Sequence, residues 1–267
     1  MTGFIGAGNM ANAIVGGMVA SGAARGEDIA VFDISAEKSE RMAETYGVLK
    51  AKSADEIAET CSEIVIAVKP FDFEKLLTGL DAVLKKHDPL LISIAAGNSI
   101  EFISSFLSYT PALVRVMPNI NATIGAAMSA YCPNERVNAE QEAFVAKLCS
   151  SIGEGVKLEE KFFSAFGVIS GAAPAFAYMF IDELARGGVK IGMNKQTALK
   201  IAAQTVLGSA KMVAESGEYP YELIDRVCSP GGTTIEGISA LSENGFRNAV
   251  MQAVVATYEK DLKLSGK

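Results

Sequence analysis

Short apolar runs alternate with stretches of helical spacing along the first half of the chain. The apolar runs lie at 2–5, 28–33, 63–68, 90–94 and 112–116, and the helical stretches between them include 36–44, 72–84 and 100–107. Strands that alternate with helices in this way are typical of a parallel, doubly wound sheet with helices on both faces. Apolar runs at 124–131 and 155–158 enclose a helical stretch at 135–150, and we expect them to complete the sheet.

Helical spacing replaces the strand pattern in the second half of the chain. Asn194 stands where a helix cap is expected, Gly217 and Gly245 interrupt the apolar periodicity, and Pro220 fits the first turn of a short helix. A charged cluster at 159–161 separates the two patterns. The sequence therefore predicts an α/β domain over 1–158 and an all-helical domain over 159–267.

The first apolar run leads directly into a glycine-rich turn and a helix. Gly6, Gly8 and Ala11 form the pattern G-x-G-x-x-A. The first glycine makes the turn, the second lets a pyrophosphate approach the backbone, and the small third residue lets the helix pack on the sheet. The pattern predicts a Rossmann-type domain that binds a dinucleotide through Gly6, Ala7, Gly8, Asn9 and Met10. A glycine-rich turn without a ligand is the alternative.

Asp33 ends the second apolar run, where an acidic residue can read the ribose of a dinucleotide. Its carboxylate can accept hydrogen bonds from the ribose hydroxyls, whereas it would repel a 2′-phosphate. No arginine follows at 34–36, although Lys38 and Arg41 are near in sequence. We expect either NADH or NADPH, with NADH slightly favoured. The alternative is that Asp33 caps the helix predicted at 36–44.

The ends of three other strands are expected to hold the rest of the cofactor, because ligands of doubly wound sheets lie beyond the carboxyl ends of the strands. These ends lie at 68–70, 95–97 and 117–119. The expected cofactor contacts are Ala67, Val68, Lys69, Pro70, Ala95 and Asn119. For Lys69 the alternative is a solvated lysine at a strand end.

A second glycine-rich stretch, 228–234, lies between two predicted helices. Gly231 and Gly232 let the backbone turn, and Thr233 with Glu236 has the spacing of a capping box, so a helix is expected to begin there. Free amides and the positive end of a helix dipole attract a carboxylate or a phosphate. The stretch therefore predicts an anion-binding loop, and a plain turn between helices is the alternative.

Composition excludes several classes of function. The net charge is -7, the pI is near 5.0 and tryptophan is absent, so we expect no nucleic-acid partner. The cysteines have no C-x-x-C spacing and His87 is the single histidine, so no metal site is expected. His87 is interpreted as a surface residue. Reduced thiols and the lack of a secretory signal pattern favour a cytoplasmic protein.

An uncharged stretch at 162–181 has the length of a membrane span. Serines, glycines and Pro174 dilute its hydrophobicity, and an acidic, amphipathic pattern follows. We expect a buried helix pair at a subunit interface and no membrane partner, with a membrane helix as the alternative.

Five motifs together resemble the pyrroline-5-carboxylate reductase family, and they span nearly the whole chain. They are Phe4-Ile5-Gly6-Ala7-Gly8-Asn9-Met10-Ala11, Ala67-Val68-Lys69-Pro70, Arg115-Val116-Met117-Pro118-Asn119, Gly171-Ala172-Ala173-Pro174-Ala175-Phe176 and Ser229-Pro230-Gly231-Gly232-Thr233-Thr234-Ile235. The last motif is the specific one, because many dehydrogenases share the first.

The resemblance implies reduction of L-1-pyrroline-5-carboxylate by NAD(P)H, the final step of proline biosynthesis. It also implies a helical domain that interlocks with a second copy in a homodimer, often within larger rings of dimers. The substrate carboxylate would lie on Ser229, Gly231, Gly232, Thr233 and Thr234, with the catalytic Thr234 hydroxyl near the ring nitrogen.

The sequence departs from the family pattern at three places. Ile120-Asn121 replaces a common Thr-Pro, Ala127 stands where a glycine is common, and Asp33-Ile34 replaces polar or basic residues. Cofactor preference therefore cannot be inherited from the family.

Two other classes of protein share parts of the pattern. A different imine or 2-hydroxy-acid dehydrogenase would need a lysine or histidine as acid and base, and Lys190 and Lys195 are the nearby candidates. A non-catalytic dinucleotide-binding module would keep Gly6 and Gly8 but would need no anion-binding loop.

Overall fold

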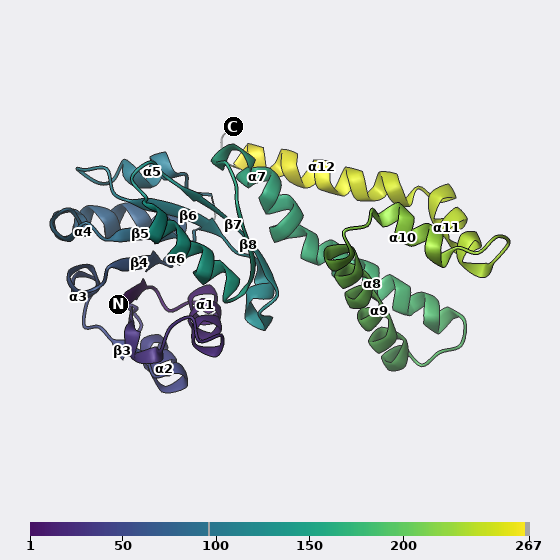
Figure 1. Ribbon diagram of the computed structural model, residues 1–267, viewed down its shortest axis with the longest axis horizontal. Coiled ribbons are helices and arrows are strands. Elements are labelled where there is room, and N and C mark those ends of the chain that lie inside the picture. The colour runs from purple at the N-terminus through teal and green to yellow at the C-terminus, as the bar shows by residue number, and fades with distance from the viewer. Residues whose placement is uncertain (96, 265–267) are drawn as a thin grey trace. The chain divides into compact units, whose positions relative to one another are not determined.

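The computed structural model describes residues 1–95 and 97–264, so Ala96, within the predicted strand end 95–97, lies outside the described residues. Contacts divide the chain into two compact units, Met1–Gly171 and a second unit that begins at Ala172 (Figure 1). The first unit contains β1 (Thr2–Ile5), α1 (Asn9–Ala20), η1 (Gly26–Asp28), β2 (Ile29–Phe32), α2 (Ala36–Tyr46), β3 (Leu49–Lys50), α3 (Ala54–Thr60), β4 (Glu63–Ile66), η2 (Pro70–Asp72), α4 (Phe73–His87), β5 (Leu90–Ser93), α5 (Ile100–Ser104), β6 (Leu113–Met117), η3 (Ile120–Ile124), β7 (Ala127–Pro133), α6 (Ala139–Ser150), β8 (Gly153–Lys157), η4 (Glu160–Phe162), α7 (Phe163–Phe166) and the π-helix η5 (Gly167–Ala172), whose last residue begins the second unit.

The strands form one eight-stranded sheet in the order β3-β2-β1-β4-β5-β6-β7-β8. The strand order reverses between β1 and β4, which places a ligand-binding crevice at their carboxyl ends. β7 runs antiparallel to β6, whereas the other neighbouring strands are parallel. The sheet is therefore mixed and mostly parallel: the first six strands follow the parallel pattern that the sequence predicts, and β7 reverses it. The short 3₁₀ connection η3 suffices to join antiparallel strands, whereas a parallel pair needs a longer crossover.

Alternate residues along the central strands pack on opposite faces of the sheet. On β4, Val65 belongs to the core that also contains Ile14 of α1 and Leu148 of α6. Its neighbour Ile64 belongs to the other core, with Leu77 of α4 and the rest of the α3, α4 and α5 face. Both faces of the sheet are thus covered by helices, as the near-continuous apolar strands predict.

The start of the long helical stretch packs on the sheet of the first unit. The Arg115 guanidinium lies 4.5 Å from the centroid of the Phe163 ring and 2.9 Å from Glu160 Oε1. Further along, the Ser170 hydroxyl donates to the Met128 carbonyl at 2.9 Å. These contacts are the reason that the first unit extends to Gly171, whereas the sequence pattern places the boundary after residue 158.

The second unit is entirely helical over its described residues. It contains α8 (Ala173–Lys190), α9 (Lys195–Ser216), α10 (Pro220–Val227), α11 (Thr233–Glu243) and α12 (Phe246–Leu264). The Asn194 side chain caps α9 by accepting from the Gln196 amide at 2.9 Å, and Gly217 ends that helix with a φ of 70°. The predicted capping box at Thr233 is wrong, because Gly232 is the N-cap of α11 and no side chain caps it.

Much of the apolar surface of the second unit is uncovered in a single chain. Its buried apolar cluster consists of Ala185, Ala198 and Ala202, with Ile181 packed against them. Residues 160–190 form the single helical stretch, within the described part of the chain, that is long and apolar enough to cross a membrane. Its apolar window is only 11% buried, so one chain by itself does not provide the buried helix pair that the sequence predicts.

Candidate active site

Gly6 and Gly8 have different structural roles in the turn after β1. Gly6 has a φ of +106°, and a Cβ there would lie 2.7 Å from the Ala67 carbonyl oxygen at the end of β4. Gly8 is the N-cap of α1 with a φ of -75°, and a Cβ there would meet no atom within 4 Å. Gly6 is therefore required by the fold itself. The space beside Gly8 is a cradle that a pyrophosphate would fill, which fits a dinucleotide.

Asp33 joins the end of β2 to this turn. Its Oδ2 accepts from the Ala7 amide at 2.7 Å, and its Oδ1 accepts from the Ser35 amide at 2.8 Å. Ser35 is the N-cap residue of α2, so the alternative in which Asp33 caps that helix is wrong. Each carboxylate oxygen has further lone-pair capacity and can still accept from a ribose hydroxyl.

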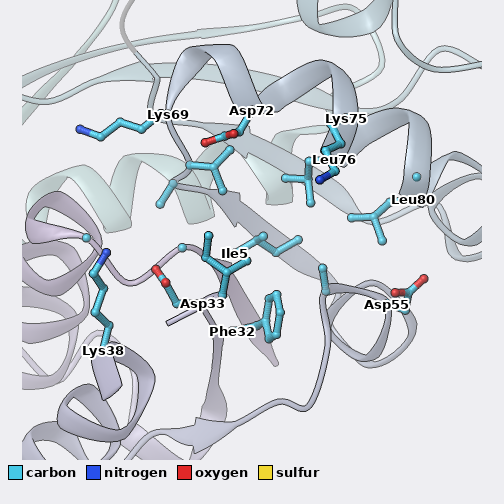
Figure 2. A pocket seen from close by; sticks show the side chains of 17 residues that line it. Ile5, Phe32, Asp33, Lys38, Asp55, Lys69, Asp72, Lys75, Leu76 and Leu80 are labelled. Atoms are coloured by element: carbon cyan, nitrogen blue, oxygen red, sulfur yellow. The ribbon is translucent and has the colours of Figure 1, made fainter. Parts of the chain in front are cut away.

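A cavity of about 490 Å³ opens at the carboxyl ends of β1, β2 and β4. Six of the expected cofactor residues line it, namely Gly6, Gly8, Asp33, Ala67, Val68 and Lys69. In the view of Figure 2, Asp33 and Lys38 lie at one end of the cavity, and Leu80 and Asp55 lie at the other. The topological switch point of the sheet and this cavity therefore coincide.

The remaining expected cofactor residues lie outside the lining of this cavity. The Ala7 amide donates a hydrogen bond to Asp33, and Asn9 lines a second hollow of about 700 Å³ beside α1 and η3. Asn119 is buried, and its amide nitrogen donates to the Ser170 carbonyl at 3.0 Å. Met10, Pro70 and Ala95 do not line the cavity either.

One face of α4 supplies lining residues that the sequence analysis does not anticipate. Asp72, Lys75, Leu76, Gly79 and Leu80 line the cavity from η2 and α4. Their spacing is that of a single helix face. The spacing alone could have identified the face, but not the cavity that it borders.

The 229–232 stretch forms a tight turn before α11. The Gly232 amide donates to the Ser229 carbonyl at 3.0 Å, and Gly231 has a φ of +67°. A Cβ on Gly232 would lie 2.3 Å from Ser229 Oγ. Pro230 and Gly231 suit the second and third positions of a type II turn, so Gly231 is the glycine that the turn geometry requires, whereas Gly232 leaves room for the Ser229 hydroxyl.

Thr234 lies in the first turn of α11 and lines a cavity of about 620 Å³ between α9, α10 and α11. Gln204, Thr205 and Cys228 line the same cavity, whereas no lysine or histidine of the described residues does. Lys190 ends α8 and Lys195 begins α9, and both side chains are exposed. The acid and base that a 2-hydroxy-acid dehydrogenase needs are therefore not found beside Thr234.

Potential metal ligands do not gather in groups of three or more anywhere in the described residues. The four cysteines are free thiols. His87 is exposed at the last position of α4.

Two family models match parts of the chain. Residues 160–264 match the family described as pyrroline-5-carboxylate reductase dimerisation, and residues 1–97 match that described as NADP oxidoreductase coenzyme F420-dependent. The pyrroline-5-carboxylate reductase of Escherichia coli (strain K12) is 41% identical over 263 residues, covering 98% of this chain and 97% of the relative. The chain belongs to the pyrroline-5-carboxylate reductase family.

Further relatives and solved structures of the family agree with this assignment. The Glycine max enzyme is 39% identical, covering 98% of this chain and 95% of its own. The Coxiella burnetii enzyme superposes with a TM-score of 0.94 at 29% identity, covering 98% and 97% of the two chains. The Plasmodium falciparum enzyme, solved with NADP bound, has a TM-score of 0.84 at 32% identity and covers 100% and 98%.

Membership of this family confirms the predicted fold class and the predicted class of enzyme, an NAD(P)H-dependent oxidoreductase of proline biosynthesis. The dimerisation domain implies a homodimer. Residues 160–190, long enough to cross a membrane, fall entirely within the matched range of that domain.

Proposed function

We propose that this protein reduces L-1-pyrroline-5-carboxylate to L-proline with NAD(P)H, which is the final step of proline biosynthesis. The observation that carries the proposal is membership of the reductase family over nearly the full length. The Ser229–Thr234 stretch adds support, because its tight turn leads into a helix start with no side-chain cap.

The cofactor binds in the cavity beside Gly6, Gly8 and Asp33, and Lys69 borders the same cavity at the end of β4. Amides at the start of α1 have no intrahelical partners and face the pyrophosphate across the open space at Gly8. Asp33 accepts from the ribose hydroxyls and favours NADH slightly over NADPH. Ala7, Asn9, Met10, Pro70, Ala95 and Asn119 complete the proposed cofactor residues.

The substrate carboxylate binds at the start of α11. The Gly232 amide is engaged within the turn at 3.0 Å from the Ser229 carbonyl, so the amides of Thr233 and Thr234 are the principal donors, with Gly231 and the Ser229 hydroxyl beside them. Gly232 leaves room for the Ser229 hydroxyl because it lacks a Cβ. The positive end of the helix dipole adds to the attraction.

The reaction needs positioning and charge stabilisation more than side-chain acid-base chemistry. The bound cofactor supplies the hydride that reduces the imine carbon. The Thr234 hydroxyl accepts a hydrogen bond from the ring nitrogen when that nitrogen is protonated, and it donates when the nitrogen is neutral. Holding the cation in this orientation lowers the barrier through alignment and electrostatic stabilisation.

The enzyme works as a homodimer in the cytoplasm, and its helical domain interlocks with that of a second copy. Larger rings of such dimers are compatible with this arrangement. The uncovered apolar surface of α8 and α9, including Met179 and Leu207, supports the dimer.

Oxidation of NADH and of NADPH, each followed with pyrroline-5-carboxylate at matched concentrations, tests the proposed function. We expect substrate-dependent oxidation of both cofactors, proline as the product and a modest preference for NADH. Absence of turnover with either cofactor would overturn the proposed activity, and a strong preference for NADPH would overturn the role of Asp33.

A further inference from the structure

The ribose end of the cofactor cavity contains a lysine with no ionic partner. Lys38, in the first turn of α2, lines the cavity with Asp33 and is exposed to solvent. Among residues 1–95 and 97–264, no carboxylate forms an ion pair with Lys38. An unpaired ammonium group therefore borders the place where the adenosine ribose binds.

Two backbone amides partly offset the negative charge of Asp33 at this end of the cavity. Its two oxygens accept from the Ala7 and Ser35 amides at 2.7 and 2.8 Å. Backbone N–H groups that point at a carboxylate stabilise its charge and reduce the field that it projects into the cavity. The repulsion that Asp33 exerts on a bound anion is therefore weakened. The positive charge of Lys38 can balance the remaining repulsion.

Arg41, the other cation near Asp33 in sequence, is excluded from this role by its surroundings. Its guanidinium pairs with Glu37 at 3.0 Å. It lines a separate surface hollow with Glu37, Glu40 and Glu44, and it does not line the cofactor cavity. The two cations lie on the same helix, but only Lys38 faces the cofactor.

We infer that Lys38 binds the 2′-phosphate of NADPH and is the residue that lets this Asp33-containing pocket use both cofactors. The inference rests on the proposed function, because it concerns the cofactor of the same reaction. A 2′-phosphate carries a charge of about -1.5 to -2 near neutral pH, and the flexible lysine side chain meets it as a point charge. NADH has a hydroxyl at this position and gains nothing comparable from Lys38.

A binding experiment tests the subsite without any turnover. Calorimetric titration of the dimeric enzyme with adenosine 2′,5′-bisphosphate and with 5′-AMP compares two ligands that differ only in the 2′-phosphate. Lys38→Gln should weaken binding of the bisphosphate about tenfold, as expected for a lost charge-assisted contact at an exposed site. Arg41→Gln is the matched control, and it should leave the ratio of the two Kd values as it is in the wild type.

Steady-state kinetics gives a second, independent readout. In Lys38→Gln the ratio of kcat/KM for NADPH to that for NADH should fall about tenfold, and Lys38→Arg should restore most of it because the charge returns. In the wild type the KM for NADPH should rise more steeply with salt than the KM for NADH, and Lys38→Gln should remove this difference.

The two experiments separate failure of the inference from failure of the proposed function. If Lys38→Gln keeps the wild-type ratio of the Kd values for the bisphosphate and 5′-AMP, with its thermal unfolding unchanged, Lys38 does not bind the 2′-phosphate. If the bisphosphate result holds but pyrroline-5-carboxylate is not reduced, the subsite stands and the proposed reaction is wrong.

Discussion

At the scale of single residues, the hydroxyl of Thr234 is the side-chain group with the most direct proposed role in the chemistry. It lies in the first turn of α11 and borders a cavity that contains other hydroxyl groups, such as that of Thr205. The two threonines therefore allow a comparison in which the same methyl-for-hydroxyl change is made at two places in one cavity.

Thr234→Val should lower kcat/KM about ten- to a hundredfold, because a hydrogen bond to a charged group is worth about 1.5 to 3 kcal/mol. Thr205→Val is the control and should change kcat/KM by less than about threefold. Initial rates with either cofactor check the prediction. Wild-type rates in a folded Thr234→Val variant would remove the hydroxyl from the mechanism.

Tyr109 is a second residue with a testable property, and it lies away from both proposed ligand sites. Its hydroxyl is buried and has no hydrogen-bond partner within the described part of the chain. Burial, with smaller contributions from Asp88 and Asp81, raises the pKa of Tyr109 from 10.0 to about 12. Because the raised pKa favours the neutral form, the folded state loses stability as the pH rises above the unfolded value of 10.0.

Tyr109→Phe should therefore be at least as stable as the wild type at neutral pH, by up to about 1 kcal/mol, because an unsatisfied buried hydroxyl is removed. Between pH 10.0 and about 12 the difference in favour of the variant should widen. Urea unfolding at a series of pH values measures it. A difference that stays constant through that window would contradict the assigned burial of the phenol.

At the scale of elements, the turn between β1 and α1 contains one glycine that the fold requires and one that we expect to matter for ligand binding. Gly6 adopts a backbone conformation that disfavours a side chain, and it packs against the Ala67 carbonyl. Gly8 has an ordinary φ and open space beside it. The same substitution at the two glycines should therefore have opposite consequences.

Gly6→Ala should destabilise the fold by roughly 1 to 3 kcal/mol, since it combines strain at positive φ with a steric clash. Gly8→Ala should keep the thermal midpoint of the wild type and raise the Kd of both cofactors, because its methyl group occupies the space of the pyrophosphate. Thermal unfolding and cofactor titration of the two variants decide this. Equal loss of stability in both would show that the turn acts only as a structural element.

Most elements could be predicted because each depends on short-range pattern. The central strands and the starts of α9 and α10 lie where periodicity, Asn194 and Pro220 place them. The two-residue β3 has too little apolar pattern to recognise, since both of its residues are exposed. The direction of β7 depends on pairing with β6 across the sheet, which no local signal encodes.

At the scale of the whole molecule, the helical unit is apolar beyond what one chain can bury. Its internal cluster consists of three alanines, while Met179 is 69% exposed on α8. Ordering long helices without a core is unfavourable, because most helical stability in proteins comes from tertiary packing. We therefore expect folding of this unit and dimerisation to be coupled.

Met179→Glu should convert the dimer to monomers and lower both thermal stability and activity, since it places a charge on the apolar surface. Leu49→Glu, on the exposed edge strand β3 of the first unit, is the control and should remain dimeric. Sedimentation equilibrium gives the mass of each variant. A dimer of wild-type stability in Met179→Glu would show that this part of α8 is not in the interface.

The sequence by itself determined the two glycine-rich turns, 6–8 and 229–232, and the helical second half, because glycine conformations, helix starts and apolar periodicity act over a few residues. Only the tertiary structure decided that Lys38 and one face of α4 border the cavity at the carboxyl ends of β1, β2 and β4 while Arg41 does not. It likewise decided that the first unit extends to Gly171. These outcomes depend on contacts between segments that are distant in the sequence. The strand order and the packing of the folded chain decide which segments are in contact.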